Sequence, residues 1–207
     1  MSYVLGFFAA DGYITVNKRG GQFWCIQITD GILLKEIRRV LNSDHKISER
    51  ISEKPNEKNL YRLQIGSIEM CDDLRKLGFD ERKTKNLSVP NVPNKYLADF
   101  VRGYFDGDGH VWVGELNKER KTPHIVIQTV FTSCSQIFLY SLKMSLEYSG
   151  ICNGRLVKGK GNFYRLVFSV NGTLNLYKFM YNSSCIKNKL FLKRKKVIFE
   201  KFIKMRL

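Results

Sequence analysis

The sequence predicts an α+β protein made of two pseudo-symmetric subdomains, each with the element order αββαββα. The first observation is a repeat, because residues 4–12 read VLGFFAADG and residues 101–109 read VRGYFDGDG. The second is that the tripeptide Tyr-Arg-Leu of residues 61–63 recurs, in the same order along the chain, at residues 164–166. The two offsets, 101 − 4 = 97 and 164 − 61 = 103, differ by six, which predicts an insertion in the second copy. We expect this insertion to include the polar stretch of residues 115–123.

The first copy opens with a short apolar helix over residues 3–12 that ends in Asp-Gly. Residues 13–17 alternate polar and apolar side chains, as a half-buried strand does, and residues 23–29 return as a second strand after Gly20-Gly21. Asp30 is placed to cap a helix whose apolar residues 33, 34, 37, 40 and 41 share one face. A hairpin over 46–66 and a helix over 67–77, followed by Gly78, complete the copy.

The second copy repeats this order. We expect a helix over 98–109, strands near 110–114 and 124–131, a helix near 135–149, a hairpin over 151–170 and a helix over 172–181. This places the subdomains at residues 1–81 and 98–207, with a linker over 82–97 that contains Pro90 and Pro93. A basic helix near 190–205 ends the chain, where residues 187–207 hold nine Lys+Arg and one Glu.

The charge favours a polyanionic partner. The 207 residues include 35 Lys+Arg and 19 Asp+Glu, a net charge of +16, and residues 100–207 supply 19 − 6 = +13 of it. Nucleic acid is the commonest partner of such a chain. Hydrophobic residues at 43% exclude a disordered chain. The sequence has neither an apolar run of the ~18 residues that a membrane helix needs nor a signal-peptide pattern, and its five cysteines form no CxxC pair. We therefore expect an intracellular protein, not secreted and without a membrane partner, whose cysteines are reduced and mostly buried.

Each repeated helix ends in an acid, Asp11 or Asp108. An acid is unfavourable at a helix C-terminus, because the negative end of the helix dipole lies there. Small residues four apart, Gly6 with Ala10 and Gly103 with Gly107, would let the two helices pack closely and bring the acids together. A divalent cation would relieve their repulsion. One Asp-Gly alone would indicate only a helix-terminating turn, but two at equivalent positions favour a metal site.

These paired segments resemble the two motifs of the single-chain, monomeric LAGLIDADG homing endonucleases. The stretch KTKNLSVPNVP, residues 83–93, before the second motif is also similar to that family, and the resemblance covers nearly the whole chain. One departure is Ala9, where the second motif has Asp106. This is not the family's metal-binding position, so we expect little effect.

The resemblance implies a pseudo-symmetric, Mg²⁺-dependent endonuclease, with Mn²⁺ able to substitute, in which two antiparallel sheets form a DNA-binding saddle around the motif helices. Asp11 and Asp108 would be the catalytic metal ligands, joined by the carbonyl groups of Ala10 and Gly107. A basic residue after the last helix of each subdomain would assist, which points to Lys83 and Lys85 in the first copy and to Lys187, Lys189 and, less directly, Lys193 in the second. The protein would act as a monomer on double-stranded DNA, at a long asymmetric target, and leave short 3′ overhangs.

Side chains on the exposed faces of the strands are expected to read the DNA, because antiparallel strands can lie in the major groove. With Ile14 and Val16 facing the core in the first copy, and Val111 and Val113 in the second, the candidate contacts are Tyr13, Thr15, Asn17, Lys18, Arg19, Gln27, Arg50, Arg62, Gln64, His110, Trp112, Gln128, Arg155, Lys158 and Arg165. Each could equally be an exposed polar strand residue. Trp24 is expected in the core rather than on this surface.

Two other functions remain open. A non-cleaving intron RNA maturase or DNA-binding regulator could have the same fold, since fold does not decide function. A basic RNA-binding module would explain the charge and leave the duplicated acids unexplained. The host element, whether an intron, an intein or a free-standing gene, is not apparent from the sequence.

Overall fold

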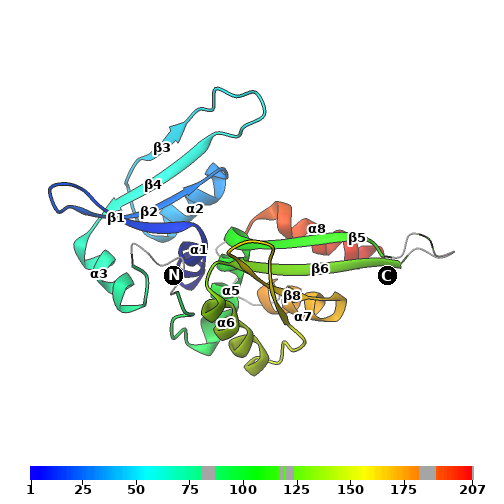
Figure 1. Ribbon diagram of the computed structural model, residues 1–207. Helices are drawn as coiled ribbons and strands as arrows, with labels where there is room; N and C mark the ends of the chain where they lie inside the picture. Colours follow the sequence, from blue (N-terminus) through cyan, green and yellow to red (C-terminus); the bar gives the residue numbers. More distant parts are fainter. Residues whose placement is uncertain (81–86, 117–118, 120–123, 182–189, 207) are drawn as a thin grey trace.

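The computed structural model describes residues 1–80, 87–116, 119, 124–181 and 190–206. Its architecture is the predicted α+β fold, with two four-stranded antiparallel sheets in the orders β1-β2-β4-β3 and β5-β6-β8-β7. The sheets lie on opposite sides of the helix pair α1 and α5, which pack against each other at the centre of the molecule (Figure 1). The repeat read from the sequence is thus a repeat of structure.

The elements of the first repeat agree with the prediction to within one or two residues at most ends. They are α1 (Ser2–Asp11), β1 (Gly12–Val16), β2 (Gln22–Ile28), α2 (Gly31–Val40), β3 (Ile47–Arg50), β4 (Leu60–Gly66) and α3 (Ile68–Lys76). Asp30 caps α2 by accepting a hydrogen bond of 3.0 Å from the Leu33 amide, as its position predicted. Ser67 caps α3 in the same way, and Gly78 has the left-handed φ of +89° that a glycine tolerates after a helix.

The second repeat has the same order of elements. They are α5 (Asn94–Asp108), β5 (Gly109–Leu116), β6 (His124–Ser133), α6 (Gln136–Tyr148), β7 (Arg155–Lys158), β8 (Tyr164–Phe168) and α7 (Val170–Tyr181), followed by α8 (Lys193–Lys204). The insertion lies in the first hairpin, which spans residues 109–133 here and 12–28 in the first repeat, a difference of 25 − 17 = 8 residues. Helix α5 begins at Asn94, inside the range 82–97 expected for the linker, because Pro93 fits the N-cap position.

The core forms between the helices and one face of each sheet. In β2 the buried residues Trp24, Ile26 and Ile28 alternate with residues on the opposite face, so Trp24 belongs to the core as expected. The cysteine expectation was partly wrong. Cys25 and Cys71 are buried, but Cys134 and Cys152 are exposed. No helix of the described residues is long and apolar enough to cross a membrane.

Candidate functional site

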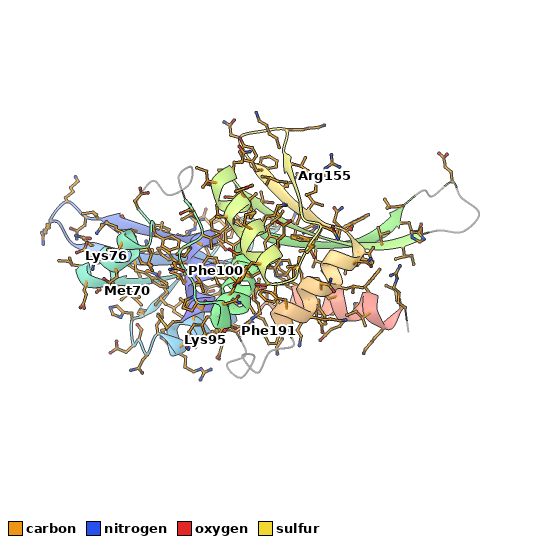
Figure 2. The ribbon with its side chains drawn as sticks, turned by 90° about the horizontal axis from the view of Figure 1, so that it is seen from below. Met70, Lys76, Lys95, Phe100, Arg155 and Phe191 are labelled. Atoms are coloured by element: carbon orange, nitrogen blue, oxygen red, sulfur yellow. The ribbon has the colours of Figure 1, made fainter. Side chains whose placement is uncertain are left out.

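The two motif helices meet through glycines placed reciprocally. A Cβ atom on Gly6 would lie far closer than 3.0 Å to the carbonyl oxygen of Phe100, and one on Gly103 would collide in the same way with the carbonyl oxygen of Tyr3. Tyr3 and Phe100 are themselves equivalent positions, since 100 − 3 = 97 is the offset of the motifs. The contact is therefore pseudo-twofold, as in a symmetric dimer interface. Figure 2 shows Phe100 at the centre, where the two repeats join.

Both helices end in an acid followed by a glycine, and the glycine turns the chain directly into a strand. Gly12 has φ −83° and ψ 159°, and Gly109 has φ −90° and ψ 154°, so neither needs the left-handed region. They are required for space, because a Cβ at either position would enter the ring of the preceding Phe8 or Phe105. These close turns fix the acids at the helix ends.

Asp11 and Asp108 approach one another across the helix pair. Asp11 Oδ2 lies 3.1 Å from the point where a Cβ of Gly107 would stand, so a larger residue there would press on this carboxylate. Both acids also act on Tyr104, whose pKa is raised by burial first, then by the charge of Asp108 and, more weakly, by that of Asp11. Asp11 is half-buried and Asp108 is exposed. Asp11 therefore lies beside the residue that precedes Asp108, at the end of the helix pair that is open to solvent.

This donor set fits a hard divalent cation. It combines two carboxylates with the carbonyl oxygens that the last turn of each helix directs past its end, among them those of Ala10 and Gly107. Within the described residues, no group of three or more His, Cys, Asp or Glu side chains could hold a metal ion. Mg²⁺ is commonly held by one or two carboxylates, with water and phosphate oxygens completing its coordination.

Lys195 is the basic residue that the structure places beside this centre, and the sequence analysis missed it. Its Nζ donates hydrogen bonds to the carbonyl oxygens of Phe105 (2.7 Å), Asp106 (2.8 Å) and Gly109 (2.6 Å), with a longer one to Gly107 (3.4 Å). Burial lowers the pKa of Lys195 to about 8, while Asp106 and, more weakly, Asp11 and Asp108 oppose the shift. The ammonium group therefore neutralises the negative end of α5 at the acids.

The four lysines predicted as catalytic, Lys83, Lys85, Lys187 and Lys189, lie outside the described residues. Lys193 is exposed in the first turn of α8. Its neighbour Arg194 lines a cavity of about 220 Å³ together with Asp11, Gln27 and Gly107. This places an arginine side chain near Asp11 that the sequence pattern did not single out.

Asp106, the residue that breaks the symmetry of the motifs, is buried and holds the C-terminal segment to the helix pair. Its Oδ2 accepts hydrogen bonds from the Tyr3 hydroxyl (2.7 Å) and the Leu192 amide (2.9 Å). Burial raises the pKa of Asp106 to about 6, against these hydrogen bonds and the charges of Lys195 and Arg102. Its counterpart Ala9 is packed in the core and can make no such bonds. Asp106 thus has an architectural role that the sequence comparison did not anticipate.

The exposed face of the first sheet carries most of its candidate DNA contacts. The register pairs Tyr13 with Cys25 and Cys25 with Gln64, and in the next row it pairs Gln27 with Arg62. Tyr13 is 37% exposed, and its pKa is raised first by burial and then by the nearby Cys25, while Arg62 opposes the shift. Among the other candidates of this repeat, the structure places Thr15 and Arg50 on the same face and Lys18 and Arg19 in the exposed β1–β2 turn.

The second sheet has an equivalent face. Trp112, 43% exposed, pairs with Gln128, and His110 is exposed one row away. On the neighbouring strands Arg165 pairs with Thr132, and Arg155 pairs with Val167. Aromatic, arginine and glutamine side chains therefore gather on one face of each sheet, opposite to the face that carries the buried residues Ile14 and Val111.

Three strand residues lie elsewhere than expected. Val16 is 49% exposed at the last position of β1, although it shares the face of the buried Ile14. Asn17 lies in the turn, where its Oδ1 accepts hydrogen bonds from the Arg19 and Gly21 amides. Lys158 lies two residues after Leu156 on β7, so both side chains are on the same face of the sheet, opposite to that of Arg155.

The comparisons with known proteins agree with this geometry. A family model described as a LAGLIDADG-like domain matches residues 1–78. A 114-residue part of the chain is 32% identical to the probable translation initiation factor IF-2 of Thermococcus kodakarensis, and the match covers 53% of this chain. It covers only 9% of the length of that relative.

Solved structures match over nearly the whole chain. The LAGLIDADG meganuclease I-AabMI bound to uncleaved DNA aligns with a TM-score of 0.64 and 15% identity, over 98% of this chain and 88% of its own. The LAGLIDADG homing endonuclease I-LtrWI bound to target DNA aligns with a TM-score of 0.65 and 14% identity, over 99% of this chain and 88% of its own. I-SmaMI bound to its uncleaved DNA target in the presence of calcium ions aligns with a TM-score of 0.62 and 16% identity, over 98% of this chain and 89% of its own. The LAGLIDADG-like domain model thus matches the first repeat, and the chain as a whole has the two-repeat fold of the solved LAGLIDADG homing endonucleases.

Proposed function

We propose that this protein is a site-specific DNA endonuclease that makes a Mg²⁺-dependent double-strand break with short 3′ overhangs. The observation that carries the proposal is the pair Asp11 and Asp108 at the meeting C-termini of α1 and α5. A protein that only bound nucleic acid would gain nothing from two carboxylates placed among phosphates.

The residues around the ends of α1 and α5 would have different roles in cleavage. Asp11 and Asp108, with the carbonyl groups of Ala10 and Gly107, would hold the metal, which supplies an activated water and stabilises the charge of the phosphate and the leaving oxygen. Lys195 holds the end of α5 through four carbonyl groups and adds positive charge beside both acids. Arg194, in the cavity with Asp11, is suited to a phosphate oxygen.

The exposed sheet faces would hold the DNA on both sides of the acids. Arginine and glutamine side chains on these faces suit base edges in the major groove, and the lysines suit phosphates. Because the two repeats differ at most of these positions, the target is expected to be long and asymmetric. One chain carries both repeats, so a monomer would suffice.

Part of this chain is similar to a segment that makes up only 9% of the length of a translation initiation factor. This supports an origin in a mobile element inserted into a host gene. An intein fits this pattern better than an intron or a free-standing gene does, since the similar segment lies within a much longer protein.

The test is cleavage of a randomised duplex library in Mg²⁺, with sequencing of the cut ends and an Asp11→Asn/Asp108→Asn double variant as control. A recurring long site with short 3′ overhangs, absent from the control, is expected. Absence of cut ends in both Mg²⁺ and Mn²⁺, with salt-sensitive binding of DNA or RNA retained, would overturn the proposal and indicate a maturase or a regulator.

A further inference from the structure

An apolar groove of about 570 Å³ opens on the helical side of the first repeat. It lies between α1, α3 and the segment before α5, with Leu5, Phe8, Met70, Leu74 and Leu77 among its lining residues and Trp24 at its base. Figure 2 shows Met70 on α3 and Lys95 in the first turn of α5, two of the helices that border it. Trp24 faces the helices, whereas Tyr13 and Gln64 face the other side of the sheet, so the groove stays open when DNA covers the strands.

The equivalent groove of the second repeat is filled by the protein itself. The motif offset of 97 relates Leu5 to Arg102 and Phe8 to Phe105. Arg102 donates hydrogen bonds to the carbonyl oxygens of Leu190 (3.0 Å) and Met180 (2.8 Å), which brings the C-terminal segment onto α5 and α7. Phe199 of α8 then packs on Phe105, with ring centroids 5.7 Å apart.

Phe199 also packs on α7, 5.4 Å from the ring of Tyr177, and is fully buried. A short apolar segment followed by a basic amphipathic helix is therefore what this kind of groove accepts. In the first repeat Phe79, which follows α3, packs on Phe8 with ring centroids 5.6 Å apart. No helix of the described residues lies over α1 and α3 as α8 lies over α5 and α7, and Leu77 remains 39% exposed.

The charges bordering the groove point to the same kind of occupant. Helix α3 carries three acids, Glu69, Asp72 and Asp73, against two bases, a net charge of −1 in a chain of +16. Glu69 and Asp73 line the groove itself. Helix α8, the occupant of the equivalent groove, carries six Lys+Arg against one Glu.

We propose that the α1–α3 groove is a docking site for a basic amphipathic helix of a partner protein. Its apolar side chains enter the groove between Leu5 of α1 and the α3 residues Met70 and Leu77, and its basic side chains face the acids of α3. The site is separate from the strand faces, so the partner binds with or without nucleic acid.

The test uses a synthetic peptide with the sequence of residues 190–206 as the probe, titrated into the full chain carrying Trp112→Phe. Trp24 is then the only tryptophan, and because it lies at the base of the groove its emission reports occupancy. Saturable binding is expected. It should weaken at least tenfold with Leu77→Glu and remain unchanged with the control Met144→Glu, an exposed residue of α6 in the other repeat.

Other results would overturn the proposal. A scrambled peptide of the same composition that binds equally well would show charge attraction without docking. Binding that is insensitive to Leu77→Glu would place the peptide elsewhere, including the site of α8. A dimer in sedimentation that Leu77→Glu converts to monomer would identify a second copy of this chain as the occupant instead.

Discussion

Gly6 and Gly103 set how closely the two repeats approach, because each stands against a carbonyl oxygen of the opposite motif helix. Their spacing to Ala10 and Gly107 was visible in the sequence and correctly predicted a close helix pair. The reciprocal contact with Tyr3 and Phe100 was not visible, since it depends on the angle at which the helices cross.

Gly6→Ala is therefore expected to destabilise the protein by about 1–3 kcal/mol, since the added methyl forces the helix backbones apart. The gain of alanine helix propensity, about 1 kcal/mol, offsets only part of this. Urea unfolding of the variant measures the loss. Gly161→Ala is the control, because a Cβ there meets only the Phe163 side chain at 3.5 Å. Equal stability of both variants would contradict the contact.

Tyr3→Phe tests the buried hydrogen bond to Asp106. The hydroxyl donates to a carboxylate, and such bonds contribute about 1.5–3 kcal/mol. We expect a loss of stability of that size in thermal or urea unfolding. Tyr96→Phe, at a 45% exposed position of α5, should change little. If the two variants unfold alike, Asp106 is held by other groups.

At the scale of elements, most helices and strands were predictable because their signals are local. Capping residues such as Asp30, Ser67 and Ser135 begin three helices, and the alternation of β2 marks its buried face. What could not be predicted depends on distant partners. In the sequence Lys195 is one of four consecutive basic residues, and nothing distinguishes it from the others. Its hydrogen bonds to carbonyl groups at the end of α5 form only because α8 packs there.

The packing of α8 is expected to depend on Phe199, whose ring contacts α5 and α7. Phe199→Ala should cost about 3–5 kcal/mol, the usual range for a buried phenylalanine. Val197→Ala, at a 40% exposed position of the same helix, should cost about 0.5 kcal/mol or less. Chemical denaturation of both variants gives the comparison, and a small cost at Phe199 would mean that α8 adds little to the core.

Over the whole molecule, the net charge of +16 and the arginine and glutamine side chains of the two sheets support the proposed binding of nucleic acid. Lysines and arginines that neutralise phosphates release counterions, so the affinity depends on salt. With about 6–10 phosphates neutralised, the affinity for duplex DNA should fall by roughly 10³–10⁵-fold between about 50 and 200 mM salt. Fluorescence anisotropy across this range measures the slope, and a flat titration would count against binding by the sheets.

The proposed cleavage depends on Asp11 and Asp108 acting together, and their equivalence follows from the repeat of the motif at an offset of 97. The most direct measurement is strand-resolved cleavage of the recovered target by the wild type, Asp11→Asn and Asp108→Asn. Each single variant is expected to keep its DNA affinity but to lose double-strand cleavage by about 10²-fold or more, since both acids serve one centre. Full double-strand cleavage by both single variants would contradict it.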